Sequence, residues 1–188
     1  VKMNLQSDDR MYKFLSRAED SCFKAKELSN RLLTFSKGGR PKIESISIVK
    51  LVNDYTMLSL SGSNVYLNFQ VKGTIDNIAV DQEQIRQVIT SIVENAREAM
   101  PHGGELIVRI ENESVSGKTS LPLNKGEYVK ISFIDHGIGI PNENIAKIFD
   151  PYFSTKTRGA EKGMGLGLSI SYSIINKHNE CITVTSKV

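Results

Sequence analysis

The chain has 188 residues, of which 39% are hydrophobic and 24% are charged, and these ordinary values exclude collagenous, disulfide-dense and largely disordered proteins. Its 24 basic and 21 acidic residues leave a net charge of +3, too weak to indicate binding to nucleic acid or to a membrane surface. We therefore expect no nucleic-acid partner, and composition alone does not indicate an activity.

Apolar runs and cysteine spacing bear on the compartment. The apolar runs, such as Leu106 to Ile110, are far shorter than the roughly 20 residues that cross a bilayer. Cys22 and Cys181 are isolated and match no metal-ligand spacing, which suits two structural thiols in a reducing compartment. We expect a cytoplasmic domain, in an intact protein that is either soluble or attached to a membrane.

Residues from about Asp8 to Lys37 are predicted to form one long helix, because their apolar residues recur with a period near 3.6. The sequence Gly38-Gly39, followed by Pro41, is a strong helix stop. These signals predict a domain boundary near residue 40, with a helical region at 1–40 and a second domain at 41–188.

The second domain is predicted to begin with short elements. A β-prone stretch, Ile43 to Ile48, precedes a helix that ends at Gly62. Val65 to Val71 alternates apolar and polar residues as a half-buried strand does, and Asn77 to Val80 is its expected neighbour.

An amphipathic helix is then predicted from about Gln82 to Met100. Asp81 is placed to cap its N-terminus, and Pro101 with Gly103-Gly104 ends it. The residues expected to face inward are Ile85, Val88, Ile89, Ile92, Val93 and Ala96.

The C-terminal part is predicted to hold three strands and one helix. The strands are Glu105 to Glu111, Tyr128 to Ile134 and Ile182 to Ser186, and the helix is Leu166 to Lys177, after an irregular segment from Gly137 to Lys162. Strands interleaved with helices, with few parallel crossovers, indicate an α/β (α+β) two-layer sandwich with one mixed sheet and helices on one face.

The first cluster of candidate functional residues is Val93-Glu94-Asn95-Ala96, inside the amphipathic helix. Asparagine is unfavourable in a helix interior because its side chain competes for backbone hydrogen bonds. Either Glu94 and Asn95 simply lie on the solvent face, or the Asn95 oxygen is a ligand for a magnesium ion that holds phosphates.

The second cluster, Asp135-His136-Gly137-Ile138-Gly139-Ile140, directly follows a predicted strand. A carboxylate at a strand end, followed by glycines that let backbone approach a ligand, could accept a hydrogen bond from the exocyclic amine of adenine. A glycine turn that contains an aspartate is the alternative.

The third cluster, Gly163-Met164-Gly165-Leu166-Gly167-Leu168, leads directly into the last predicted helix. Its glycines expose backbone N–H groups at the positive end of a helix dipole, which favours phosphate. It is neither a Walker pattern nor a dinucleotide-binding turn, since no Gly-Lys-Ser/Thr follows and no strand immediately precedes it. A flexible hinge is the alternative.

Between the last two clusters lies the stretch Ile148-Phe149-Asp150-Pro151-Tyr152-Phe153-Ser154-Thr155-Lys156, followed by Arg158 and Lys162. Aromatic and basic residues in a glycine-flanked loop are typical of a closing lid, in which apolar side chains anchor the loop and cations meet phosphates. For Arg158 and Lys162 taken singly, a solvated charged loop is the alternative.

Taken in order, Glu-Asn-Ala, Asp-x-Gly-x-Gly-Ile, Phe-Asp-Pro-x-Phe-Ser-Thr-Lys and Gly-x-Gly-Leu-Gly-Leu resemble the motifs of sensor histidine kinases. These kinases belong to the superfamily shared with DNA gyrase, the Hsp90 chaperone and the MutL repair protein. The resemblance runs from about residue 43 to the C-terminus. The Leu32-Leu33-Thr34-Phe35-Ser36 end of the first helix also resembles the second helix of the kinase dimerisation hairpin.

The resemblance implies the left-open, Bergerat-type ATP-binding sandwich, with ATP and Mg²⁺ as the bound groups. It implies that Asp135 reads adenine, that Asn95 binds magnesium, and that Phe149 and Phe153 anchor the lid. The residues implied to bind ATP are Asn95, Asp135, Gly137, Gly139, Ile140, Lys156, Gly163, Gly165, Leu166, Gly167 and Leu168.

Two positions depart from the family pattern. The superfamily's ATP-hydrolysing members have a water-activating glutamate one turn before the motif asparagine, and Ser91 stands there. Without this base we expect slow hydrolysis, so that the γ-phosphate is transferred to a better nucleophile than water. Glu98 stands where related kinases often have lysine, and it would repel phosphate unless it faces away.

The resemblance also implies partners, namely an acceptor histidine on the kinase's own homodimer and the receiver domain of a response regulator. No histidine precedes His102, and His102, His136 and His178 are expected in surface or capping roles, so the acceptor lies outside this chain. We expect a piece trimmed at both ends that binds ATP but does not phosphorylate itself on the usual residue. The alternatives are a hydrolysing member of the superfamily and a non-catalytic ATP-binding module.

Overall fold

The computed structural model describes residues 11–12, 14–19, 21–22, 41–117, 121–155 and 165–188. The chain forms two compact units, Val1–Gly39 and Arg40–Val188. In the first unit the described residues are helical, and the rest of the helix predicted from Asp8 to Lys37 lies outside the described residues. Within the described part of the chain, no helix has the length and apolar character needed to cross a membrane.

The second unit contains nine regular elements among its described residues. In chain order they are β1 (Glu44–Ile46), α2 (Ile48–Leu60), β2 (Val65–Lys72), β3 (Ile78–Val80), α3 (Gln82–Ala99), β4 (Gly104–Val115), β5 (Gly126–Ile134), α4 (Asn142–Ile145) and α5 (Gly167–Lys177). The predicted order of strands and helices up to β5 is therefore confirmed.

The main sheet is mixed and has the strand order β2-β4-β5. Strands β2 and β4 are parallel, with Val65 opposite Gly104, and β4 and β5 are antiparallel, with Ile107 opposite Ile134. Strands β1 and β3 form a separate antiparallel pair, so the prediction that Asn77 to Val80 neighbours Val65 to Val71 is wrong. The mixed sheet predicted from the sequence is confirmed.

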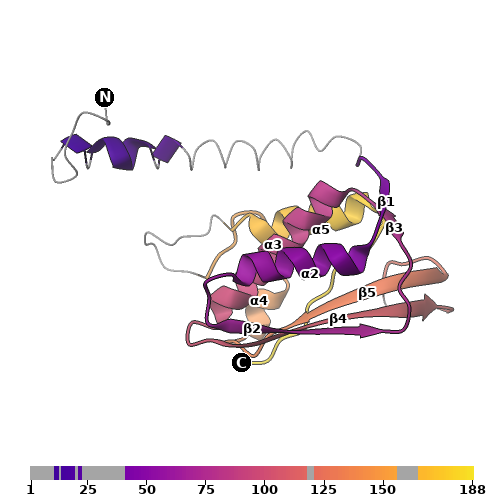
Figure 1. The fold of residues 1–188 in the computed structure, drawn as a ribbon. Coiled ribbons are helices and arrows are strands. Elements are labelled where there is room, and N and C mark those ends of the chain that lie inside the picture. Colours follow the sequence, from indigo (N-terminus) through magenta and orange to yellow (C-terminus); the bar gives the residue numbers. More distant parts are fainter. Residues whose placement is uncertain (1–10, 13, 20, 23–40, 118–120, 156–164) are drawn as a thin grey trace. The chain divides into compact units, whose positions relative to one another are not determined.

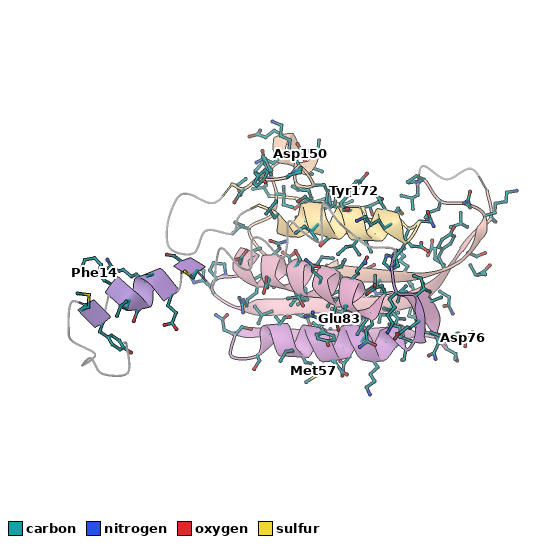
Figure 2. All side chains as sticks on the ribbon, turned by 90° about the horizontal axis from the view of Figure 1, so that it is seen from above. Phe14, Met57, Asp76, Glu83, Asp150 and Tyr172 are labelled. Carbon is teal, nitrogen blue, oxygen red and sulfur yellow. The ribbon has the colours of Figure 1, made fainter. Side chains whose placement is uncertain are left out.

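Three helices cover one face of this sheet, and they lie side by side in the order α2, α3, α5 (Figures 1 and 2). The central strand β4 supplies the sheet's part of the core, because every second side chain along it, Leu106, Val108 and Ile110, is fully buried. The helices contribute Ile48 and Val52 from α2, Ile89 and Val93 from α3, and Ile170 and Ile174 from α5. The predicted two-layer sandwich is thus confirmed.

The opposite face of the sheet is polar, as expected of a face that contacts water. Cross-strand pairs run along it: Asn68 donates a hydrogen bond to Glu105 at 2.9 Å, Arg109 donates to Gln70 at 3.2 Å, and Lys72 pairs with Glu111 at 2.9 Å. Such cross-strand pairs, two of them half-buried and one exposed, align neighbouring strands, but each adds only about 0.2–1 kcal/mol to stability.

Three predictions about the C-terminal half differ from the structure. The strand predicted from Ile182 to Ser186 is wrong, because residues 180–188 form no strand and pass Gly139 and Ile140 instead. Strand β4 continues to Val115, beyond the predicted end at Glu111. The segment predicted to be irregular contains the short helix α4.

Candidate nucleotide-binding site

Helix α3 is the element along which the candidate residues gather. It begins at the N-cap Asp81, whose side chain accepts a hydrogen bond from the Gln84 N–H, and its periodic apolar residues pack into the core. Asn95 is half-buried on this helix, and its side chain makes no hydrogen bond to any described residue. Ser91 lies one turn earlier on the same side of the helix.

The cluster that begins with Asp135 follows β5 directly and packs on the last turn of α3. Asp135 Oδ1 accepts a hydrogen bond from the Gly137 N–H at 2.9 Å, and the Ile138 N–H donates to the Ala99 carbonyl at 3.0 Å. A Cβ on Gly137 would lie 2.5 Å from the Ala99 Cβ and 2.6 Å from its carbonyl oxygen, so only glycine fits. We call this contact of Ala99 with Gly137 and Ile138 the Ala99 end of the site.

Gly139 and Ile140, also in the predicted set, meet the C-terminal segment. Gly139 has a positive φ of 72°, and a Cβ there would overlap the Lys187 carbonyl oxygen. The Ile140 N–H donates a hydrogen bond to Ser186 Oγ at 2.9 Å. In the structure these two residues therefore contact the C-terminal segment and do not line an open space.

The glycines before α5 pack on the middle of α3. A Cβ on Gly167 would lie 2.5 Å from Ser91 Oγ, so the first residue of α5 sits directly on Ser91. Leu166 is buried beside it and Leu168 is half-buried. We call this contact of Ser91 with Gly167, together with Gly165, the Ser91 end of the site.

The start of α5 has the features of an anion site. The N-cap residue, Leu166, makes no side-chain capping hydrogen bond, and the Ser169 hydroxyl bonds to the Leu166 carbonyl rather than to a backbone N–H. No described residue therefore accepts from the first-turn N–H groups of this 11-residue helix, which lie at the positive end of its dipole and suit an anion.

The two predicted lid anchors lie near this helix. The Phe149 ring packs on the Tyr172 ring of α5, with 5.2 Å between centroids, and Figure 2 shows Tyr172 on the side of α5 that faces the segment carrying Asp150. Phe153 is half-buried, and its carbonyl oxygen would lie 2.5 Å from a Cβ on Gly165. The Tyr152 N–H also donates to the Gly165 carbonyl at 2.9 Å. This bond joins the segment that carries Phe149 and Phe153 to the turn just before α5.

The structure thus brings four separated stretches of the sequence onto one helix and its neighbour. Lys156 and Gly163, which belong to the predicted ATP set, lie outside the described residues. Sequence reasoning missed Ala99 and Tyr172, because an alanine near a helix end and a tyrosine on a helix surface carry no signal of a site.

The residues fit a magnesium ion held largely by phosphates. The described residues contain no group of three or more His, Cys, Asp or Glu side chains that could enclose a metal on their own. Mg²⁺ usually keeps several waters and takes one or two protein oxygens in addition to substrate phosphates. The unpartnered, half-buried amide of Asn95 is a suitable oxygen donor for that arrangement.

Comparison with known proteins gives a consistent picture. A family model described as histidine kinase-, DNA gyrase B- and HSP90-like ATPase matches residues 80–188. The chain is 31% identical to the sensor kinase CckA of Brucella abortus (strain 2308), over 98% of this chain and 20% of that protein. It spans between 15% and 30% of the length of the first curated relatives that it matches.

Solved structures agree in fold. The catalytic domain of histidine kinase ThkA superposes with a TM-score of 0.56 at 28% identity, over 72% of this chain and 80% of that chain. ThkA in complex with the response regulator protein TrrA has a TM-score of 0.62 at 21% identity, over 95% of this chain and 48% of that chain. The chain therefore belongs to the family of histidine kinase-, DNA gyrase B- and HSP90-like ATPases, and its residues 80–188 carry a histidine kinase-type ATP-binding domain.

Proposed function

We propose that this domain binds ATP with Mg²⁺ and transfers the γ-phosphoryl group to a histidine outside this chain, from which it passes to an aspartate of a response regulator. The observation that carries the proposal is the convergence on α3. The Ala99 end and the Ser91 end lie two helical turns apart, about 12 Å along the axis, with Asn95 between them.

In this proposal the Ala99 end receives the base. The Asp135 carboxylate is exposed at the end of β5, and its second oxygen accepts no hydrogen bond from any described residue. A free carboxylate oxygen suits the exocyclic amine of adenine. Gly137, Gly139 and Ile140 shape the backbone beside it.

The Ser91 end receives the phosphates. The first-turn N–H groups of α5 and the backbone from Gly165 to Leu168 supply donors and positive potential, and Gly163 and Lys156 complete the set. Asn95 would hold Mg²⁺, which neutralises charge on the phosphates. Phe149 and Phe153 hold the chain that leads into the lid.

Phosphoryl transfer in such a site depends mainly on positioning and on charge neutralisation. The bond between the γ-phosphorus and the β,γ-bridging oxygen breaks, and a bond from that phosphorus to an imidazole nitrogen forms. Ser91 has no acidic or basic group that could activate water, which favours transfer to histidine over hydrolysis.

The proposed partners lie outside the chain. Residues 1–40 would be part of the helical dimerisation region, 41–188 the catalytic domain, and the intact kinase a homodimer in the cytoplasm, where ATP is available. The ThkA complex with a response regulator supports a receiver domain as the final acceptor. His102, His136 and His178 all lie within the catalytic domain, so this piece is not expected to phosphorylate itself on the usual residue.

Titration with ATP and Mg²⁺ tests the site. We expect Asp135→Asn to weaken ATP binding at least about tenfold, since a hydrogen bond to a charged group contributes about 1.5–3 kcal/mol. Asn95→Ala should weaken binding in the presence of Mg²⁺ and have little effect when a chelator removes the metal. The exposed Asp76→Asn is the matched control. Unchanged affinity in both site variants would remove the assignment.

A transfer assay separates the kinase from its rivals. The chain is incubated with radiolabelled ATP and a separate dimerisation hairpin that carries the acceptor histidine. Acid-labile label on the hairpin supports the kinase, whereas binding without label supports a non-catalytic ATP module. Steady release of inorganic phosphate at a rate above that of transfer would support a hydrolase instead.

A further inference from the structure

Asp81, at the start of α3 and away from the Ser91 end, forms hydrogen bonds to three parts of the domain. Asp81 Oδ1 accepts from the Gln84 N–H at 3.0 Å, and Asp81 Oδ2 accepts from the Lys42 N–H at 2.8 Å. The Asp81 N–H itself donates to His178 Nε2 at 3.1 Å. The start of the domain, the start of α3 and the end of α5 therefore meet at Asp81, and we call these four residues the Asp81 junction.

His178 uses both ring nitrogens in this junction. Nε2 accepts from Asp81, and Nδ1 lies 2.9 Å from the carbonyl oxygen of Ile174, one turn back on α5. These two contacts require the neutral imidazole with its proton on Nδ1. The ring is thus a bridge of fixed geometry between the last turn of α5 and the first residue before α3.

The two contacts of α5 with α3 lie at opposite ends of α5. Gly167, its first residue, sits on Ser91, and His178, the residue after its last, bonds to Asp81, so the helices run antiparallel. Between these points the helix buries Ile170 and Ile174. An 11-residue helix is a rod of about 16 Å, so a shift at the His178 end displaces the Gly167 end as well.

We propose that His178 is a positioning residue for the nucleotide phosphates. By holding the end of α5 to Asp81, it fixes where the first turn of α5 lies relative to Asn95. His178 touches neither base nor phosphate, and it acts through the helix. This inference rests on the proposed function, because the phosphates are those of the nucleotide assigned to the Ser91 end.

The two ends of the site should respond differently to a change at His178. The Ala99 end is fixed by the Ile138 N–H bond to the Ala99 carbonyl and by the packing of Gly137, neither of which involves α5. The Ser91 end is formed by the first residue of α5 itself. Losing the junction bond is therefore expected to weaken contacts to phosphate and to leave contacts to adenosine unchanged.

A matched pair of amides isolates the Asp81 bond. The side chain of His178→Gln is long enough to present an oxygen near the position of Nε2, whereas His178→Asn is one methylene shorter and cannot reach the Asp81 N–H. Both substitutions keep a neutral amide at the end of α5. His178→Phe keeps a ring and removes both hydrogen bonds, and His102→Phe, in an exposed turn, is its control.

Affinities for ATP with Mg²⁺ and for adenosine are measured on the whole chain by calorimetry and NMR titration. We expect His178→Asn and His178→Phe to bind ATP about fivefold to tenfold more weakly with unchanged adenosine affinity, and His178→Gln to stay within about twofold of wild type. Equal ATP affinity in the Gln and Asn variants, or a parallel loss for ATP and adenosine, would overturn the proposal. If His178→Phe does not fold, the amide pair decides alone.

Failure of the proposed function gives a different result. If the wild-type chain does not bind ATP, or binds it without dependence on Asp135, the nucleotide site itself is wrong. If the wild type binds ATP through Asp135 while the His178 variants match it, the positioning role alone is wrong.

Discussion

The Ala99 end and the Ser91 end of the site are built from different kinds of contact. At the Ala99 end, glycine backbone meets helix backbone, and a backbone hydrogen bond at 3.0 Å fixes the distance. At the Ser91 end, glycine meets a serine hydroxyl, which can rotate about its χ1 bond. In the proposed function, the rigid backbone contact suits a base of constant shape. The adjustable hydroxyl contact suits phosphates that enter and leave the site.

The largest effect in this comparison is expected at the Ala99 end. Gly137→Ala should lower the free energy of unfolding by about 3 kcal/mol, because the new methyl would overlap the Ala99 carbonyl and Cβ, which cannot move without bending α3. Urea unfolding measures it. Gly117→Ala is the control, since no atom of the described residues lies within 4 Å of a Cβ there. A loss below about 0.5 kcal/mol for Gly137→Ala would show that this end is not rigid.

The Ser91 end should accommodate an added methyl group at a lower cost in stability, and a double-mutant cycle measures this cost. A Cβ on Gly167 would lie 2.5 Å from Ser91 Oγ but 3.7 Å from Ser91 Cβ, so the conflict is with the hydroxyl alone. Gly167→Ala is expected to cost about 1.5 kcal/mol in the wild-type background and close to nothing alongside Ser91→Ala. Additive costs in the double variant would contradict the contact.

The unfolding free energies of the Gly137 and Gly167 variants are easier to measure in a more stable background. Thr56 on α2 is fully buried, and its hydroxyl has no hydrogen-bond partner among the described residues. We expect Thr56→Val to raise the unfolding free energy by about 1 kcal/mol, because it removes an unsatisfied polar atom and keeps the shape. Thermal unfolding of this variant checks the sign, and Thr90→Val, at a half-buried position of α3, serves for comparison. A destabilised Thr56→Val would imply that the hydroxyl is satisfied.

The smallest effect concerns Glu180, just beyond α5. Desolvation by neighbouring atoms raises the pKa of its carboxyl. The folded protein then binds the proton more tightly than the unfolded chain, so stability falls as pH rises from the ordinary glutamate pKa to the raised one. Glu180→Gln should therefore be slightly more stable than wild type at neutral pH and equal to it under acidic conditions. A pH series of unfolding midpoints shows whether the two curves converge.

The sequence carried enough information to predict α3 almost to the residue. Its apolar period, the capping Asp81 and the Pro101 and glycine stop are local signals, and the observed helix runs from Gln82 to Ala99. The end of β4 was not predictable in the same way. Its last residues project beyond the core, are mostly polar, and are held by pairing with β5, which is not a local property.

The wrong strand at Ile182 to Ser186 has the same origin. Alternation of apolar and polar residues describes a strand's faces but does not supply a partner, and here the segment bonds through Ser186 to a loop. For the site, the motifs predicted a set of nucleotide-binding residues, and their binding role stays a prediction. The contacts that set the spacing, Ala99 with Gly137 and Ser91 with Gly167, involve small side chains whose role depends on close approach in three dimensions.

The parallel pairing of β2 with β4 has a consequence for how the domain forms. Val65 aligns with Gly104, so the connection between the two strands contains β3 and all of α3. Pairing across so long a connection gains its contacts only after a large loss of chain entropy, whereas β4 and β5 are neighbours along the chain. We therefore expect β2 to pair with β4, and α3 to be fixed against the sheet, later in folding than β4 pairs with β5.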